Sequence, residues 1–248
     1  SAIVEAAQEA GTPIFLACLP KVIEAIGINK LGVMAKTVME ESNVPVIYHL
    51  DHCHSVELCL AAVNYGYKSV MIDAADLPLE KNIAAVKKVV EYAHAKGVHV
   101  EAEIGKIKSA GAEGYTPEET LARVEEAKRL VEETNVDALA VSIGSEHGFY
   151  QHEPKLNYDL LDILHSNIKV PLVLHGGSGI PEEKVRQAIN GGIRKVNVGT
   201  HIRYTYIKSV GEAIEKMGAM THTADIMEYA KKNVKEVVKD WMRICENK

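Results

Sequence analysis

Three histidines in this chain occupy positions from which they could bind one metal ion. His52, His147 and His175 each stand at the end of a run of branched apolar residues, or a few residues beyond it. A neutral imidazole nitrogen is a common metal ligand, and three imidazoles with an open fourth position are typical of catalytic zinc. A single histidine of this kind is more often a core or surface residue. The shared placement of all three favours a zinc site.

The segment after His175 has the composition of an anion-binding turn. Two glycines, a serine and a third glycine follow it, and Pro181 then begins a predicted helix. Glycines let backbone N–H groups approach an anion, serine adds a hydroxyl donor, and a helix N-terminus adds a favourable dipole. We expect Gly176, Gly177 and Ser178 to hold a phosphate or a similar anion. The alternative is a plain strand-to-helix turn with an incidental histidine.

Three carboxylates also follow predicted strands. Asp51 directly precedes His52, and Asp73 and Glu103 each close an apolar run. A carboxylate beside a metal ligand can accept and return a proton during catalysis, and we expect this role for Asp51. Because side chains alternate along a strand, His49 should share a side with Asp51 and lie in the core or behind the metal ligands.

Apolar runs alternate with amphipathic helical segments along the chain, which predicts a parallel sheet whose strands all end at one face. The predicted strands cover residues 13–18, 46–50, 69–73, 98–103, 137–143, 170–174 and 195–198. The predicted helices cover residues 3–9, 28–41, 56–65, 79–96, 117–133, 158–165 and 182–190, and the sequence after 198 is largely helical.

This pattern predicts a (β/α)8 TIM barrel, in which catalytic groups gather at the carboxyl ends of the strands. Seven strands, and a helix with no strand before it, suggest that the first strand is missing from this sequence. We expect one TIM-barrel domain over residues 1–248, completed by C-terminal helices. An open doubly wound sheet is the second choice, but no GxGxxG motif follows an early strand.

The composition limits the expected partners and compartment. The chain has 248 residues, 47% of them hydrophobic and 25% charged, and its net charge of −6 gives no reason to expect a nucleic-acid partner. No apolar run is long enough for a membrane partner, and no signal peptide is visible. The four cysteines, Cys18, Cys53, Cys59 and Cys245, form no CxxC pair. We therefore expect a reducing, cytoplasmic location.

Several motifs together resemble one enzyme family. They include His49-Leu-Asp-His52, the runs at 69–73, 100–105 and 137–141, Ile143-Gly with His147-Gly148, Pro171-Leu-Val-Leu-His-Gly-Gly-Ser-Gly-Ile-Pro181, and Lys195-Val-Asn-Val198. In combination they resemble the class II, zinc-dependent ketose-bisphosphate aldolases, most of all the fructose-bisphosphate and tagatose-bisphosphate branches. The resemblance runs over nearly the whole chain.

The resemblance implies a role for each candidate residue. It makes His52, His147 and His175 the zinc ligands, puts Glu103 beside the metal, and assigns the aldehyde oxygen to Asp51. It assigns the phosphate cradle and the contacts to the dihydroxyacetone portion to Gly148, Gly176, Gly177, Ser178, Asn197 and Thr200. It also implies a monovalent cation, Na+ or K+, near these glycines, and a homodimer or homotetramer.

The implied reaction is reversible retro-aldol cleavage of a phosphorylated ketose to dihydroxyacetone phosphate and an aldehyde. Cleavage leaves a negatively charged enediolate, which zinc on the ketone and hydroxyl oxygens stabilises as a Lewis acid. A lysine Schiff base is then unnecessary. No lysine clearly ends a predicted strand, although Lys195 begins one.

The sequence departs from the family pattern at two places that bear on the substrate. Leu19 stands where a phosphate-binding serine is usual, and Lys21 could supply a charge nearby. After Glu103 the loop is short and lacks the family's Gly-Gly-x-Glu motif. Either Glu113 is a weak substitute for that glutamate, or part of a lid is missing from this sequence, which we favour. The preferred substrate need not be fructose 1,6-bisphosphate.

Other functions fit parts of the pattern. The chain could be an aldolase for a different anionic ketose, or a non-catalytic aldolase-like subunit that supports another aldolase chain. Zinc-bound water on the same fold could also hydrolyse a substrate, but the predicted phosphate cradle favours phosphosugar chemistry.

Overall fold

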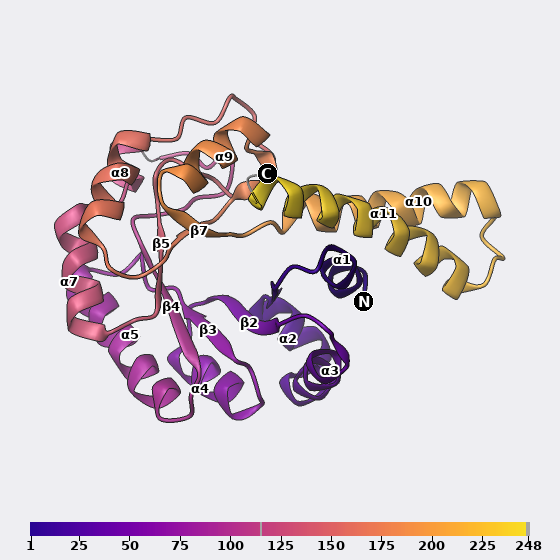
Figure 1. The fold of residues 1–248 in the computed structure, drawn as a ribbon, viewed down its shortest axis with the longest axis horizontal. Helices are drawn as coiled ribbons and strands as arrows, with labels where there is room; N and C mark the ends of the chain where they lie inside the picture. The colour runs from indigo at the N-terminus through magenta and orange to yellow at the C-terminus, as the bar shows by residue number, and fades with distance from the viewer. Residues whose placement is uncertain (115, 247–248) are drawn as a thin grey trace.

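The computed structural model describes residues 1–114 and 116–246, and these contain one parallel sheet with helices around it (Figure 1). Its seven strands are β1 (Ile14–Cys18), β2 (Val46–Cys53), β3 (Ser69–Ile72), β4 (His99–Ile104), β5 (Ala138–Val141), β6 (Leu172–Leu174) and β7 (Ile193–Val196). Each strand pairs in parallel with the next one in sequence. A doubly wound sheet would reverse its strand order, so that alternative is wrong. The predicted TIM-barrel topology is confirmed.

Most predicted helices are present, with small shifts at their ends. They are α1 (Ala2–Ala10), α3 (Ile28–Glu41), α4 (Val56–Asn64), α5 (Leu79–His94), α8 (Tyr158–Asn167), α9 (Glu182–Asn190), α10 (Thr200–Met217) and α11 (Thr223–Cys245). The short helix α2 (Pro20–Ile26) was not predicted, although proline at its first position is a common helix start.

The single helix predicted at 117–133 is wrong. The chain forms α6 (Pro117–Thr120) and α7 (Val124–Thr134) instead. Between them, the backbone N–H of Ala122 donates to the carbonyl of Ser142 at 2.8 Å. This bond to the loop after β5 takes a backbone donor that a continuous helix would use, so tertiary structure overrides the local helical pattern.

The inner strands are mostly buried on both sides, as continuous apolar runs predict, whereas the edge strands β1 and β7 are partly exposed. Every residue of β3 and β6 is buried. Inside the sheet, Met71, Ala140 and Val173 form a small apolar cluster. The register pairs Ala140 with Glu103 and Val173 with Lys195, so these two polar residues share the inner face with the cluster.

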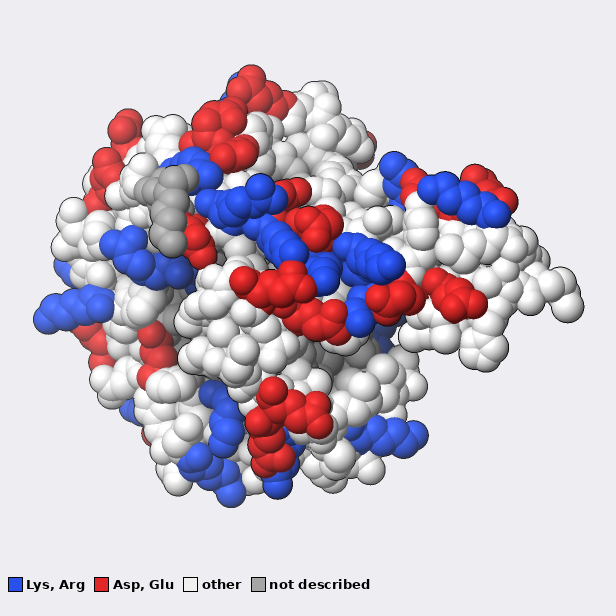
Figure 2. All heavy atoms as spheres, turned by 45° about the vertical axis from the view of Figure 1, so that its right-hand side comes forward, with Lys and Arg blue, Asp and Glu red and all other residues white. Residues whose placement is uncertain are grey.

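Strands β1 and β7 are the two edges of the sheet in the described part of the chain. A groove of about 1230 Å³ lies between them and is lined by residues of both strands and of α1, α10 and α11. Helices α10 and α11 form a hairpin that projects from the barrel (Figure 1). Lys231 and Lys235 of α11 pair with Glu5 and Glu9 of α1. Basic and acidic side chains lie side by side across this part of the surface (Figure 2).

The topology directs all strands the same way, so their carboxyl ends lie at one face of the barrel. Within the described residues, no helix combines the length and apolar character that crossing a membrane would require.

Asp137, at the start of β5, provides a test of the fold. Its Oδ2 accepts from the N–H of Val100 at 2.7 Å and from Nε2 of His94 at 2.8 Å. Burial opposes ionisation, but these hydrogen bonds lower the pKa of Asp137. A lowered folded-state pKa stabilises the fold above the unfolded pKa of about 3.9, and this stabilisation is lost as the pH falls through the folded value. We expect Asp137→Asn to lower the free energy of unfolding by about 1 kcal/mol at pH 7.

The difference between Asp137→Asn and wild type should shrink below about pH 4. Urea unfolding followed by circular dichroism at several pH values measures it. Asp162→Asn, on the exposed side of α8, is the control and should change little. If Asp137→Asn lowered the free energy of unfolding equally at pH 3 and pH 7, the stabilisation would not come from the ionised carboxylate of Asp137.

Candidate metal and substrate site

A cavity of about 430 Å³ opens at the carboxyl ends of the strands. Nearly all the residues predicted for the site line it: Asp51, His52, Glu103, His147, Gly148, His175, Gly176, Ser178, Asn197 and Thr200. The predicted residue outside this lining is Gly177. The cavity is also lined by five polar residues that were not predicted from the sequence: His54, Asp76, Lys106, Lys108 and Arg203.

The three candidate metal ligands converge from three elements. His52 is the penultimate residue of β2, His175 directly follows β6, and His147 lies in the loop after β5. The ring centroid of His52 lies 4.6 Å from the ring centroid of His147 and also 4.6 Å from that of His175. One nitrogen from each ring can be chosen so that all three lie within 4.8 Å of one another, a spacing that could hold a metal ion.

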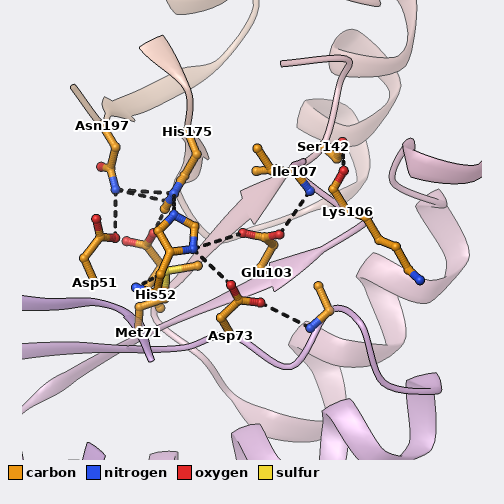
Figure 3. Close-up of polar contacts among 12 residues, drawn as sticks. Asp51, His52, Met71, Asp73, Glu103, Lys106, Ile107, Ser142, His175 and Asn197 are labelled. Carbon is orange, nitrogen blue, oxygen red and sulfur yellow. Dashed lines mark hydrogen bonds and ion pairs between the residues drawn. The ribbon is translucent and has the colours of Figure 1, made fainter. Parts of the chain in front are cut away.

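Neighbouring carboxylates decide which ring nitrogens face inward (Figure 3). Nδ1 of His52 lies 3.0 Å from Oδ2 of Asp73, and Nε2 of His175 lies 2.8 Å from Oε1 of Glu101. The remaining nitrogens, Nε2 of His52 and Nδ1 of His175, face each other at 2.7 Å. Two lone pairs cannot share that position unless a proton or a cation lies between them.

The pKa values indicate that a proton takes this place in the metal-free protein. Burial would lower the pKa of His52, but the hydrogen bond to Asp73 and the charges of Asp51 and Glu103 raise it to about 9. Burial lowers the pKa of His175, and burial with the nearby His52 lowers that of His147 to about 4. His52 is thus the protonated member, and it donates to His175. These residues fit a metal that would replace this proton.

An irregularity in β2 turns Asp51 and His52 toward the same cavity. In a regular strand two successive side chains point to opposite faces. Here the pairing of β2 with β3 shifts between Leu50 and Cys53, and His52 has a φ of 46°. The bulge therefore places a candidate acid next to a candidate metal ligand.

Two buried glutamates of β4 stand behind the histidines. Oε2 of Glu103 is buried without a hydrogen-bond partner among the described residues, and it lies 3.9 Å from Nδ1 of His52. Burial and the nearby Asp73 raise the pKa of Glu103 well above its usual range. Burial opposes ionisation of Glu101, but Lys195 and His175 lower its pKa well below the usual range. Glu101 was not predicted, yet it shares a face with Glu103 two residues on.

Asp51 is held by Asn197, which directly follows β7, and lies near His49 of its own strand. Its Oδ1 accepts from Nδ2 of Asn197 at 3.1 Å and lies 3.9 Å from Nε2 of His49. His49 is fully buried, as expected, and Nδ1 of its ring lies 2.8 Å from Oγ of Ser69. Burial, reinforced by Lys195, lowers the pKa of His49 to about 4, so its ring is neutral near pH 7.

The glycine-rich turn after β6 is shaped by close backbone contacts. Gly176 has a φ of 72°, and a Cβ there would lie 2.2 Å from the carbonyl oxygen of Glu146. Gly177 is buried, and its N–H donates to the carbonyl of Asn197 at 3.1 Å. Gly177 therefore packs the end of β7 against the turn. Oγ of Ser178 accepts from the N–H of His201 at 3.1 Å, which leaves its hydroxyl hydrogen available to a ligand.

The two departures from the family pattern have different positions in the structure. Leu19 lines the cavity and is 38% exposed, whereas Lys21 is exposed on α2 and does not line it. The loop after β4 runs beside His147, which donates its N–H to Lys108 and accepts from Ala110, both at 2.7 Å.

The predicted substitute glutamate lies farther along this loop. Glu113 is exposed and does not line the cavity. Tyr115, two residues after Glu113 in the sequence, lies outside the described residues.

Comparison with known proteins agrees with this architecture. The family model of class II fructose-bisphosphate aldolases matches residues 1–248. The chain belongs to that family. A 6-phospho-5-dehydro-2-deoxy-D-gluconate aldolase of Bacillus velezensis is 37% identical over 245 residues, which cover 98% of this chain and 84% of that aldolase. A fructose-bisphosphate aldolase of Staphylococcus aureus is 38% identical over 241 residues, 96% of this chain and 84% of the relative.

Solved aldolase structures share the fold. The YdjI aldolase from Escherichia coli K12 matches with a TM-score of 0.83 at 29% identity, over 99% of this chain and 86% of that one. A fructose-bisphosphate aldolase from Campylobacter jejuni matches with a TM-score of 0.82 and the same coverage, but its 17% identity supports the fold alone. The predicted family is confirmed, and class II aldolases are typically metal-dependent.

If zinc added to this protein takes the position between His52 and His175, its binding should depend on pH, because it would displace the proton of His52. With a pKa of about 9, His52 carries this proton at pH 7, so each bound ion should release about one proton. The affinity should rise about tenfold per pH unit toward pH 9 and then level off. Calorimetry of the metal-free protein in buffers of different ionisation enthalpy measures the release. Asp73→Asn, which lacks the carboxylate that raises this pKa, should release less. A zinc affinity of the wild-type protein that stays constant from pH 6 to 9 would show that zinc does not compete with a proton on His52.

Proposed function

We propose that this protein is a zinc-dependent aldolase that reversibly cleaves a phosphorylated ketose to dihydroxyacetone phosphate and an aldehyde. The observation that carries the proposal is the convergence of His52, His147 and His175 with Asp51 in one cavity beside a glycine-rich turn. Membership of the class II aldolase family supports the reaction class.

The metal would be held by the three histidines. Nitrogen ligands in a four-coordinate arrangement with one open position suit zinc. When bound, zinc would supply a Lewis acid that stabilises negative charge on the substrate oxygens. Glu103, whose Oε2 has no partner among the described residues, groups with His52 and Asp73 as a further set of possible ligands.

Asp51 is the residue that we assign to proton transfer. Its carboxylate is partly exposed to the cavity, and Asn197 holds one of its oxygens at 3.1 Å. During cleavage Asp51 would accept the proton of the hydroxyl whose oxygen becomes the aldehyde. In condensation it would return that proton to the same oxygen.

The phosphate of the substrate would lie at the glycine-rich turn. Gly148, Gly176 and Ser178 line this side of the cavity, and Thr200 begins the 18-residue helix α10. A helix N-terminus favours an anion, and Arg203 in the first turn of α10 adds a positive charge to the same wall. We also propose Na+ or K+ as the monovalent cation near this turn.

The lining of the cavity also bears on the chemical group at the other end of the substrate, away from the glycine-rich turn. Lys106 and Lys108 line it on the side of β4, where both pair with Asp76 at 3.6 and 2.8 Å. The two relatives of similar identity carry the names of different phosphorylated substrates. We propose a phosphorylated ketose with a second anionic group, and not necessarily fructose 1,6-bisphosphate.

We further propose that the protein acts as a homodimer or homotetramer in the cytoplasm. The α10–α11 hairpin exposes large apolar side chains, including Tyr204, Ile207, Ile214 and Met220. All four cysteines are free thiols, which agrees with a reducing compartment.

The proposed function is tested by incubating the protein with fructose and tagatose bisphosphates and measuring triose phosphate. We expect product that disappears with a chelator and returns with added zinc. Metal binding without any cleavage of these or other anionic ketoses would favour the non-catalytic subunit.

Asp51→Ala should retain zinc and lose turnover. A positioned acid or base contributes roughly 100- to 10,000-fold to the rate, so kcat should fall by about that factor. Metal analysis and steady-state kinetics of the same preparation measure both quantities. Asp162→Ala on α8 is the matched control. A fall in kcat of less than about tenfold would assign Asp51 a structural role.

Leu19→Ser should favour bisphosphate substrates. A hydrogen bond to a charged group contributes on the order of 1.5–3 kcal/mol, and about 1.4 kcal/mol corresponds to a tenfold change. We expect kcat/KM for a ketose bisphosphate to rise about tenfold in Leu19→Ser and not in Leu19→Ala. If wild type already cleaves fructose 1,6-bisphosphate efficiently and Leu19→Ser matches it, Leu19 does not select the substrate.

A further inference from the structure

A continuous hydrogen-bonded chain crosses the inside of the barrel and joins a candidate metal ligand to the candidate acid. It starts at Nε2 of His175, which lies 2.8 Å from Oε1 of Glu101. The other oxygen of Glu101 lies 2.9 Å from Nζ of Lys195. Nζ also donates to Oδ1 of Asn197 at 2.7 Å, and Nδ2 of Asn197 donates to Oδ1 of Asp51 at 3.1 Å.

Lys195 is held rigidly within this chain. Its side chain is 12% exposed, and its ammonium lies 5.2 Å from the centre of the Phe15 ring. Glu101 is 2% exposed and supplies the opposite charge. An ammonium group between a buried carboxylate and an aromatic ring has little freedom to move, so it can act as a fixed reference for its other partner.

The chemistry of the ammonium group then determines the orientation of the Asn197 amide. An amide side chain can be rotated so that its oxygen and its NH2 group exchange places. Lys195 has only donors, so the amide oxygen must face it at 2.7 Å. The NH2 group is therefore directed to Asp51, whose carboxylate oxygen accepts. The reverse orientation would oppose donor to donor at Lys195 and acceptor to acceptor at Asp51.

We propose that Lys195 is a positioning residue that fixes the Asn197 amide and, through it, the carboxylate of Asp51. The proposal deepens the proposed function, since it rests on Asp51 as the proton-transfer group. It also gives Lys195 a role in a zinc-dependent reaction, which needs no lysine to form a Schiff base. Lys195 touches no reacting atom in this scheme and acts on Asp51 through Asn197.

The variants must separate positioning from simple charge balance. Lys195→Met alone would leave Glu101 buried without its counter-charge, and the protein could fail to fold. Glu101→Gln removes that charge, and its single amide oxygen can accept from either His175 or Lys195. Lys195 is 12% exposed and keeps the Asn197 oxygen and the Phe15 ring as partners, so this variant leaves no fully buried unpaired charge. The informative pair is therefore Glu101→Gln against Glu101→Gln/Lys195→Met, which differ only in the lysine. Lys231→Met, in a surface ion pair with Glu5 on α1, is the control for a lysine-to-methionine change.

The first measurement needs no substrate. Asparagine labelled with ¹⁵N gives side-chain NH2 signals in NMR spectra, and Asn197→Asp identifies the signal of Asn197. We expect the Asn197 NH2 protons to exchange with water about tenfold faster in Glu101→Gln/Lys195→Met than in Glu101→Gln, since the amide loses its anchor. Unchanged signals in a folded protein would overturn the proposal.

The second measurement is a kinetic double-mutant cycle. Within the Glu101→Gln background, Lys195→Met should lower kcat for ketose cleavage about tenfold while KM changes less than about threefold. With Asn197→Ala also present, adding Lys195→Met should change kcat less than about twofold. A full tenfold loss without Asn197 would overturn the proposal. If wild type cleaves no ketose, the proposed function fails, while the NH2 signals still decide whether Lys195 fixes Asn197.

Discussion

A carboxylate buried inside the sheet governs the layout of this site. Glu101 is 2% exposed, and an ionised carboxylate there is unfavourable unless it is paired and hydrogen-bonded. Lys195 and His175 provide that compensation at 2.9 and 2.8 Å. Each of these partners makes a second contact toward the cavity. The need to balance one internal charge therefore sets the orientation of groups on two sides of the cavity.

The order of the elements could be predicted from the sequence because it follows from local patterns. The apolar runs that became β3 and β6 are buried on both faces, and such runs need helices between them to form a parallel sheet. Parallel strands end together, so the placement of His52 and His175 at strand ends was enough to predict that they meet. Glu101 could have been predicted in the same way, since it lies two residues before Glu103 and therefore on the same side of β4.

Features that depend on contacts between distant segments could not be predicted. The break between α6 and α7 follows from a hydrogen bond of Ala122 to Ser142, which no helical pattern encodes. Lys195 lies in β7 below the strand end, and only the width of the barrel shows that its long side chain reaches Glu101 on β4. Lys21, by contrast, is close to Leu19 in sequence but lies on the outside of α2.

The backbone conformation that directs His52 into the cavity is energetically unfavourable. Its φ of 46° is in the left-handed region, where a residue other than glycine is disfavoured by roughly 1–2 kcal/mol. Asn135 at the end of α7 has a similar φ of 55°, but asparagine tolerates that conformation well. Fold stability and the proposed metal binding thus favour different residues at position 52. In a descendant chain that no longer needed the proposed metal ligand, glycine or asparagine at position 52 would relieve this backbone cost.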